Sequence, residues 1–186
     1  STFAISSVSA QSGWLDESFD GDGIAITPAE GTGTGGVKVA LQADGKILVA
    51  GTTDAGAGKD VMIVRYLADG SIDATFGTAG VVITDLVTSD NTEDMVIQDD
   101  GKIVILTETH LMRFTADGIL DVTFDSDGSL AFPIHHRGKS VGLQSTGKIA
   151  VGSVHEIVDA IGFTYIDYPE VRLNNTDGSD FSSTTS

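Results

Sequence analysis

Ser71-Ile72-Asp73-Ala74-Thr75-Phe76-Gly77-Thr78-Ala79-Gly80 decides the fold of this chain, because the same pattern occurs three times. An earlier version, WLDESFDGDG, occupies residues 14–23, and a later one, ILDVTFDSDG, occupies residues 119–128. We call these three segments the connectors. Their phenylalanines, Phe19, Phe76 and Phe124, lie 57 and 48 residues apart. A period of roughly fifty residues is typical of propeller blades and similar β arrays.

Two further blocks recur between the connectors. The first is an apolar run, a Gln, a Gly-Lys turn and a second apolar run, and it occupies residues 39–49, 95–105 and, more weakly, 140–151. The second is an arginine strand that ends in Asp-Gly, and it occupies residues 64–70, 112–118 and 171–178. The repeats therefore divide the chain into an N-terminal extension, two regular units, a divergent third unit and the start of a further connector, at residues 1–12, 13–69, 70–117, 118–177 and 178–186.

Each unit is predicted to contain four short strands, which in the second unit are residues 81–86, 94–98, 102–107 and 110–115. Asp-Gly between two apolar runs is a strong hairpin signal, because glycine tolerates the positive φ of a tight turn. No stretch has the apolar spacing of a helix. In residues 61–67 both alternating faces are apolar, which indicates sheets stacked between neighbours. The prediction is an all-β fold of about three four-stranded, propeller-like blades.

The arginines of the second block, Arg65, Arg113 and Arg172, take the same register in their strands. An unpaired charge on a buried face would be too costly. We therefore expect each guanidinium to pair with a connector carboxylate, drawn from Asp16, Asp73 and Asp121.

These motifs resemble the delta-60 repeat family, whose units carry an LDxxFG-x-x-G connector, an LQxDGKI hairpin and a VR-hydrophobic-xxDG strand. The matching positions include Leu15, Asp16 and Phe19 of the first connector, and the resemblance covers about residues 13–181. It weakens in the third unit, where Thr146 replaces the turn aspartate. The resemblance implies propeller-like repeats of large bacterial surface or secreted proteins, and it implies no defined catalytic residues.

Composition narrows the function classes. The 186 residues carry a net charge of −17 with only ten Lys and Arg, which argues against nucleic acid and against anionic lipid. No apolar run is long enough for a membrane span. Zero cysteine excludes disulfides and thiolate zinc sites. The first residues resemble a processed N-terminus. Together with the family resemblance, these features favour a bacterial protein that is extracellular or at the cell surface.

Two loops carry carboxylates two residues apart before a glycine, Asp20 with Asp22 and Asp125 with Asp127. Calcium prefers several hard oxygens in a flexible turn, so these are the candidate metal ligands, although a solvated turn explains them as well. His135 and His136 are neighbours in a predicted strand and point to opposite faces, which disfavours zinc. No Gly-x-Ser-x-Gly elbow activates a serine, so we expect no enzyme and no required cofactor.

Three blades do not close a propeller, since closed rings generally take four to eight. The blades are expected to be incomplete or completed by oligomerisation, and residues 2–8 are a candidate closing strand. The leading function is a non-catalytic extracellular scaffold or interaction module that binds itself or other surface proteins. The alternatives are the protomer of an extracellular filament and a glycan-binding propeller whose binding depends on calcium. In the glycan-binding alternative, the side chains that could stack on a sugar are Trp14, Tyr66, Tyr165 and Tyr168.

Overall fold

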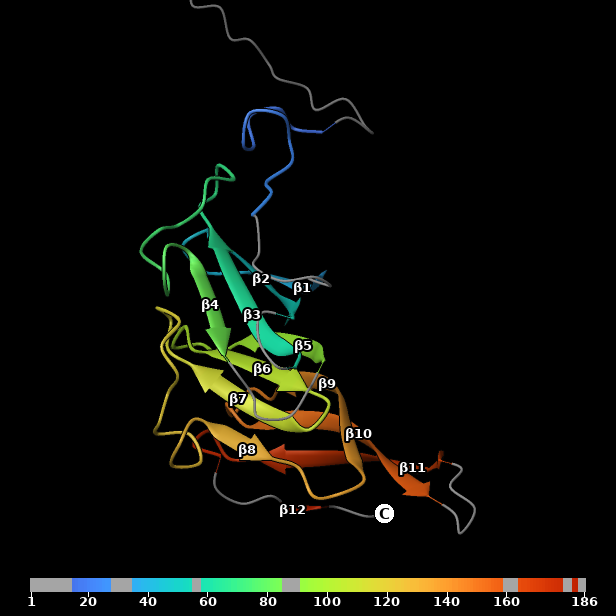
Figure 1. Cartoon of the computed structure of the whole chain (residues 1–186). Helices are drawn as coiled ribbons and strands as arrows, with labels where there is room; N and C mark the ends of the chain where they lie inside the picture. The colour runs from blue at the N-terminus through green and yellow to red at the C-terminus, as the bar shows by residue number, and fades with distance from the viewer. Residues whose placement is uncertain are drawn as a thin grey trace, which may run out of the picture.

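A computed structural model of the chain describes residues 15–27, 35–54, 58–84, 91–158, 164–178 and 182–183. These residues form strands and turns without a helix, in agreement with the predicted all-β class. The strands lie in three antiparallel four-stranded sheets that follow one another along the chain (Figure 1). No helix within the described ranges has the length and apolarity needed to cross a membrane.

The first sheet consists of β1 (Gly35–Leu41), β2 (Ile47–Thr53), β3 (Asp60–Tyr66) and β4 (Val81–Thr84). The second consists of β5 (Thr92–Ile97), β6 (Ile103–Thr107), β7 (His110–Phe114) and β8 (Ser129–Ala131). The third consists of β9 (His136–Leu143), β10 (Ile149–Val158), β11 (Thr164–Asn174) and β12 (Ser182–Ser183).

The sheets are offset by one strand from the units inferred from sequence. The repeat pattern places the run that begins at Val81 in the second unit, but β4 pairs with β3 and completes the first sheet. The reason lies in the connector, where Arg65 N donates to Gly80 O and Gly80 N donates to Phe76 O, so the chain returns beside β3. A repeat period gives the length of a unit, but it does not say which strand begins a sheet.

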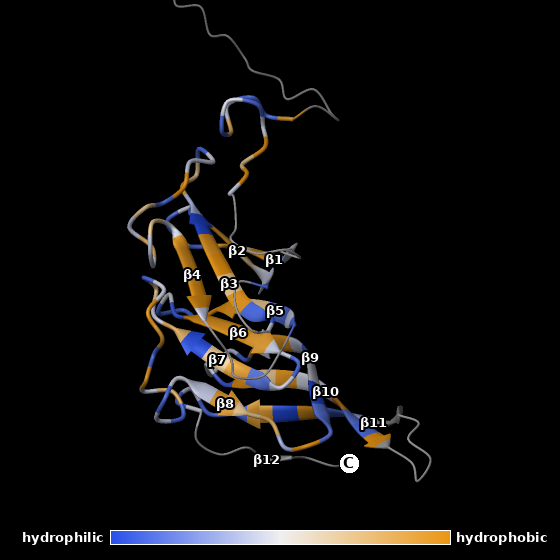
Figure 2. Ribbon diagram, in the orientation of Figure 1, coloured by the Kyte–Doolittle hydropathy of each residue, from blue (hydrophilic) through white to orange (hydrophobic). Residues whose placement is uncertain are grey.

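Two apolar cores lie between the three sheets. The core between the first and second sheets includes Leu48, Ile63, Phe76, Met95, Ile105 and Phe114. The core between the second and third sheets includes Val104, Leu106, Leu111, Phe124, Ile149 and Val151. Alternation along the strands explains the division, because neighbouring residues such as Ile103 and Val104 face opposite cores. The hydropathy colouring shows the apolar strands running through the stack, with polar residues in many of the turns (Figure 2).

The stack is an open row among the described residues. Strands β1 and β2 contact β5, and β5 and β6 contact β9. A third apolar cluster, Met62, Val64 and Tyr66, lies on the outer face of the first sheet, and Ala25 of segment 15–27 packs against it. Thr27 Oγ1 lies 2.7 Å from Tyr66 Oη, so this segment is bonded to the outer face that it crosses. In Figure 1 it is the blue segment at one end of the row.

Candidate functional site

The first arginine site joins the first two sheets. Arg65 on β3 is buried, and its Nε donates to Asp73 Oδ2 at 2.9 Å. Its Nη1 donates to the carbonyl of Ala116 at 2.7 Å, in the turn that follows β7. Its guanidinium carbon lies 4.6 Å from the centroid of the Phe76 ring, a cation–π contact. One side chain therefore binds its own connector and the neighbouring sheet. We call this arrangement an arginine seam.

The second arginine seam repeats the first between the second and third sheets. Arg113 on β7 donates to Asp121 Oδ2 at 2.8 Å, and its guanidinium carbon lies 4.8 Å from the Phe124 ring centroid. Its Nη1 donates to the carbonyl of Thr176, which corresponds to that of Ala116. Its Nη2 donates to Thr123 Oγ1 at 3.2 Å. A guanidinium offers several donors in a rigid fork, so these four partners satisfy a charge that would otherwise be costly to bury.

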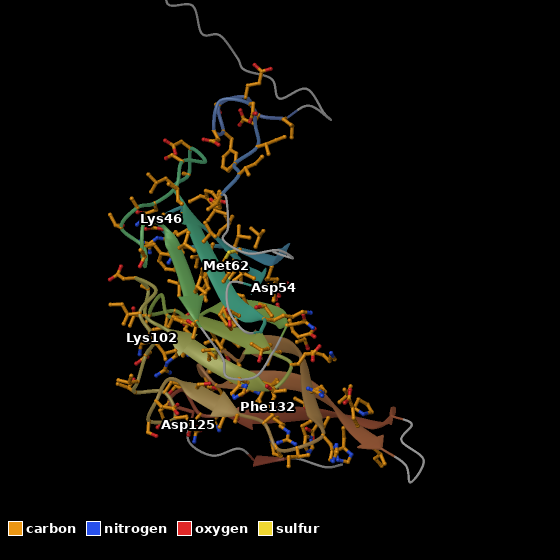
Figure 3. The ribbon with its side chains drawn as sticks, viewed as in Figure 1. Lys46, Asp54, Met62, Lys102, Asp125 and Phe132 are labelled. Carbon is orange, nitrogen blue, oxygen red and sulfur yellow. The ribbon has the colours of Figure 1, made fainter. Side chains whose placement is uncertain are left out.

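Hydrogen bonds stabilise the ionised form of both seam aspartates. The hydroxyl of Thr75 and the nearby Arg65 lower the pKa of Asp73 to about 2. Burial opposes ionisation of Asp121, but the hydroxyl and amide of Thr123, with Arg113, still lower its pKa to about 2. A lysine supports each pair, with Lys46 Nζ 3.5 Å from Asp73 and Lys102 Nζ 3.4 Å from Asp121. Figure 3 shows these two lysines along one edge of the stack.

Arg172 does not take the register of the other two arginines, and this corrects the expectation from sequence. Arg65 and Arg113 precede their Asp-Gly aspartates by four residues, but Arg172 precedes Asp177 by five. As a result Arg172 pairs across the sheet with Val151, and Leu173 pairs with Ala150, the position that corresponds to an arginine in the other sheets. A one-residue shift moves a side chain to the opposite face of a strand.

Arg172 joins a different polar cluster, on the face of the third sheet that lies toward the second sheet. Arg172 Nε donates to Glu170 Oε1, which also accepts from Ser153 Oγ at 2.8 Å and lies 2.7 Å from His136 Nδ1. Burial works against the charge of Glu170, but the bonds from Arg172, Ser153 and His136 hold its pKa below the usual value. The extra residue also leaves Asn174 fully buried, with neither amide atom hydrogen-bonded.

Asp16 lies in a connector with the same local geometry but with no arginine beside it. Its Oδ1 accepts from Ser18 N at 3.0 Å and from Ser18 Oγ at 2.6 Å, as Asp73 accepts from Thr75. These bonds from Ser18 lower the pKa of Asp16. The expected pairing of Asp16 with an arginine does not occur among the described residues, since all four arginines of the sequence have other partners there.

The four candidate calcium ligands lie in exposed or half-exposed turns. Asp22 Oδ1 accepts from Ile24 N and Asp127 Oδ1 accepts from Ser129 N, both at 2.9 Å, so one carboxylate of each pair caps its own turn. Asp20 and Asp125 have φ values of 48° and 46°. Within the described part of the chain, no three His, Asp or Glu side chains come together as a metal-binding set. Calcium binding stays a prediction.

Two cavities of about 530 Å³ lie beside the second and third sheets. The first lies among polar turns, with Asp99, Lys102, Arg113 and Gln144 in its lining. The second adjoins the divergent unit and is lined by Phe132, Ile134, Arg137, Glu156 and three histidines: His110, His135 and His136. Arg137 Nε donates to Glu156 Oε2 at 3.2 Å, which places an ion pair in this wall.

The remaining sequence candidates divide between core and undescribed positions. Tyr66 is buried and bonded to Thr27, so it offers no face for a sugar. Trp14, the side chains of Tyr165 and Tyr168, and the candidate closing strand at residues 2–8 lie outside the described residues. The rings of His136 and His155 lie 4.8 Å apart on paired strands, a contact that sequence reasoning missed because it depends on the pairing of β9 with β10.

Sequence reasoning also missed most partners of the seam arginines. The ring of Phe76, the hydroxyl of Thr75 and the carbonyl of Ala116 all contact Arg65, yet only the aspartate was expected. A signal was present, because Phe recurs three residues after each connector aspartate and a hydroxyl residue recurs two after it. The carbonyl has no such signal, since any residue supplies one.

The comparison with protein families gives one match. A family model described as a β-propeller domain of unknown function (DUF5122) matches residues 42–76 and 98–124. Each matched segment runs from the glutamine before a Gly-Lys turn, through two strands, to the phenylalanine of a connector. No curated protein matches the chain. The chain therefore contains β-propeller-like repeat units, and over these two segments it is similar to that β-propeller domain.

Proposed function

We propose that this chain is a non-catalytic scaffold module, working outside the cell, which binds further β units at the outer face of its first sheet. One observation carries the proposal. Val39 on β1 is 61% exposed, whereas its counterparts Met95 and Val141 on β5 and β9 are 1% and 9% exposed. Those two are buried because a preceding sheet packs on them, so the first sheet has the surface of a unit that receives a neighbour.

The exposed face is larger than one residue. Leu41 on β1 and Ile83 on β4 are 69% and 43% exposed, and both lie on the side of the sheet that carries the Met62 cluster. Burying apolar surface yields roughly 25 cal/mol per Å², so covering these side chains favours association. The net charge of −17 favours solubility of the module in its unbound state, when this apolar face is exposed.

The experiment measures mass by light scattering from about 1 to 200 µM, a range that covers weak protein association. We expect the mass of the wild type to rise with concentration and Leu41→Lys to suppress that rise. Val122→Lys is the matched control, because Val122 is 63% exposed in a connector and lies away from this face. A wild type that stays monomeric throughout, or an equal effect of both variants, would contradict the proposal.

A glycan-binding role is the second candidate, favoured by the cavity that combines Phe132 with three histidines and an Arg137–Glu156 ion pair. Sugar sites commonly pair a ring with polar groups that fix orientation. A glycan array with and without a calcium chelator separates the two roles. Glycan binding that the chelator abolishes would favour a calcium-dependent lectin over the scaffold.

A further inference from the structure

The three connectors bind the turn of the following arginine strand in the same way. Asp20 N donates to Asp69 O at 2.7 Å, Gly77 N to Asp117 O at 3.2 Å, and Asp125 N to Asp177 O at 2.9 Å. Each connector phenylalanine also packs against the glycine of that turn, as Phe19 does against Gly70. The first connector is therefore built like the two that bind a guanidinium.

The first connector has every acceptor of an arginine seam. Asp16 matches Asp73, and Ser18 matches Thr75. The carbonyl of Ala68, which precedes Asp69 by one residue, holds the position of Ala116, the acceptor from Arg65 Nη1. Phe19 is only half-buried, whereas Phe76 and Phe124 are fully buried under their arginines. We call Asp16, Ser18, Phe19 and the Ala68 carbonyl the arginine seat.

The chain does not supply the arginine from the usual position. Arg65 and Arg113 each precede their connector phenylalanine by 11 residues, and the residue 11 before Phe19 is Val8. The far end of the row carries none either, because the register shift in β11 places Leu173 at the arginine position of its outward face. Arg137, the remaining arginine, pairs with Glu156 and Glu108.

Building on the proposed function, we propose that the arginine seat binds an arginine presented by a β strand of a partner chain built from like units. The guanidinium donates to Asp16 Oδ2 and to the Ala68 carbonyl and stacks on Phe19, as Arg65 does at the equivalent atoms. The apolar face around Val39 and Leu41 supplies the packing, and the seat supplies selectivity for arginine over lysine, since lysine lacks the planar fork. A second copy of this chain can meet the apolar face but does not fill the seat, because its third sheet carries Leu173 at the arginine position and its Arg137 is paired with Glu156 and Glu108.

The test supplies the missing arginine in a defined probe. Leu173→Arg places a guanidinium on the outward face of the third sheet, at the cross-strand position that Arg65 and Arg113 hold in theirs. Combined with Asp16→Asn, this chain is a donor without a seat, and the wild type is the acceptor. We expect a one-to-one complex by analytical ultracentrifugation. The Asp16→Asn acceptor and the Leu173→Lys donor should each bind roughly 10- to 100-fold more weakly, the loss typical of a charge-assisted hydrogen bond.

Several outcomes would overturn the proposal. It fails if donor and acceptor do not associate, if Lys serves as well as Arg, or if the wild type self-associates through Asp16. If circular dichroism shows that the donor does not fold, the peptide acetyl-Val-Arg-Tyr-amide replaces it. Binding is then followed by the NMR shifts of the Ser18 and Phe19 amides. The seat would be refuted if the corresponding lysine peptide produced the same shifts. If Leu41→Lys prevents the association of donor and acceptor but Asp16→Asn does not weaken it, the arginine seat is refuted and the proposed scaffold function is not.

Discussion

Replacing Asp73 with asparagine tests whether the arginine seams hold the sheets together. Asparagine keeps the shape of the side chain and still accepts from Thr75, but it removes the charge that Arg65 Nε contacts at 2.9 Å. Arg65 is 3% exposed, so its charge is left in a nearly dry site. Removing one partner of a buried pair typically costs 3–5 kcal/mol. The matched control is Asp16→Asn, the same change in a connector without an arginine.

The lowered pKa of Asp73 gives a magnitude of the same order. A pKa lowered from 3.8 to about 2 corresponds to about 2 kcal/mol of preference for the charged form in the folded state. We therefore expect Asp73→Asn to lower the free energy of unfolding by about 2 to 4 kcal/mol at neutral pH. Asp16→Asn should leave the urea midpoint nearly unchanged. Urea unfolding of both variants beside the wild type, followed by circular dichroism, measures the difference.

Acid provides a second check on the same variant. Because the folded pKa is depressed, the contribution of Asp73 is complete above the unfolded value of 3.8 and is lost as the pH falls toward about 2. At about pH 3 the gap between wild type and Asp73→Asn should be roughly half its neutral value. The reasoning would be refuted by a gap that does not narrow in acid, or by a cost of Asp73→Asn no larger than that of Asp16→Asn.

Three further outcomes are expected. Asn174→Leu should raise the free energy of unfolding by about 1–3 kcal/mol in urea, because it removes a fully buried amide without partners; a loss of stability would show that the amide is satisfied. Gly118→Ala should lower the melting temperature more than Gly101→Ala does. Both glycines have φ 82°, but a Cβ at Gly118 would lie 2.7 Å from the Phe76 ring, whereas the nearest atom to a Cβ at Gly101 is 3.4 Å away. Equal losses in the two variants would mean that the ring moves aside. The wild type as a whole should lose stability between about pH 4 and pH 2, as both seam aspartates take up protons, and a flat profile across that window would contradict the lowered pKa values.

Much of the fold was predictable from local sequence. The strands expected at residues 94–98, 102–107 and 110–115 correspond to β5, β6 and β7 within one or two residues. Period-two alternation of short β-branched runs is a local property, and so is an Asp-Gly turn. The partition of strands into sheets was predicted wrongly, because pairing β4 with β3 depends on how the connector folds back through the carbonyls of Phe76 and Gly80.

The candidate site was only partly visible in the sequence. The sequence indicated that Arg65 pairs with Asp73, because an arginine on a buried strand face is destabilising unless a charge of opposite sign lies beside it. The sequence did not indicate that Ala116, on the next sheet, also binds Arg65, because a backbone carbonyl has no residue signature. Nor did the motif comparison reveal that Arg172 faces the opposite side of its strand from Arg65 and Arg113. The extra residue before Asp177 changes the register, and its effect on the side chains is visible only once β11 is paired with β10.

The sequence by itself determined that this protein is a row of repeated β units with acidic and glycine-rich turns, because periodicity and turn chemistry are written in adjacent residues. Only the tertiary structure decided where each sheet begins, which arginines form seams and which apolar side chains of the first sheet are exposed. Those properties depend on strand register and on contacts between distant sheets. A shift of one residue reverses the face of every side chain on a strand, and that is why Arg113 forms a seam and Arg172 does not.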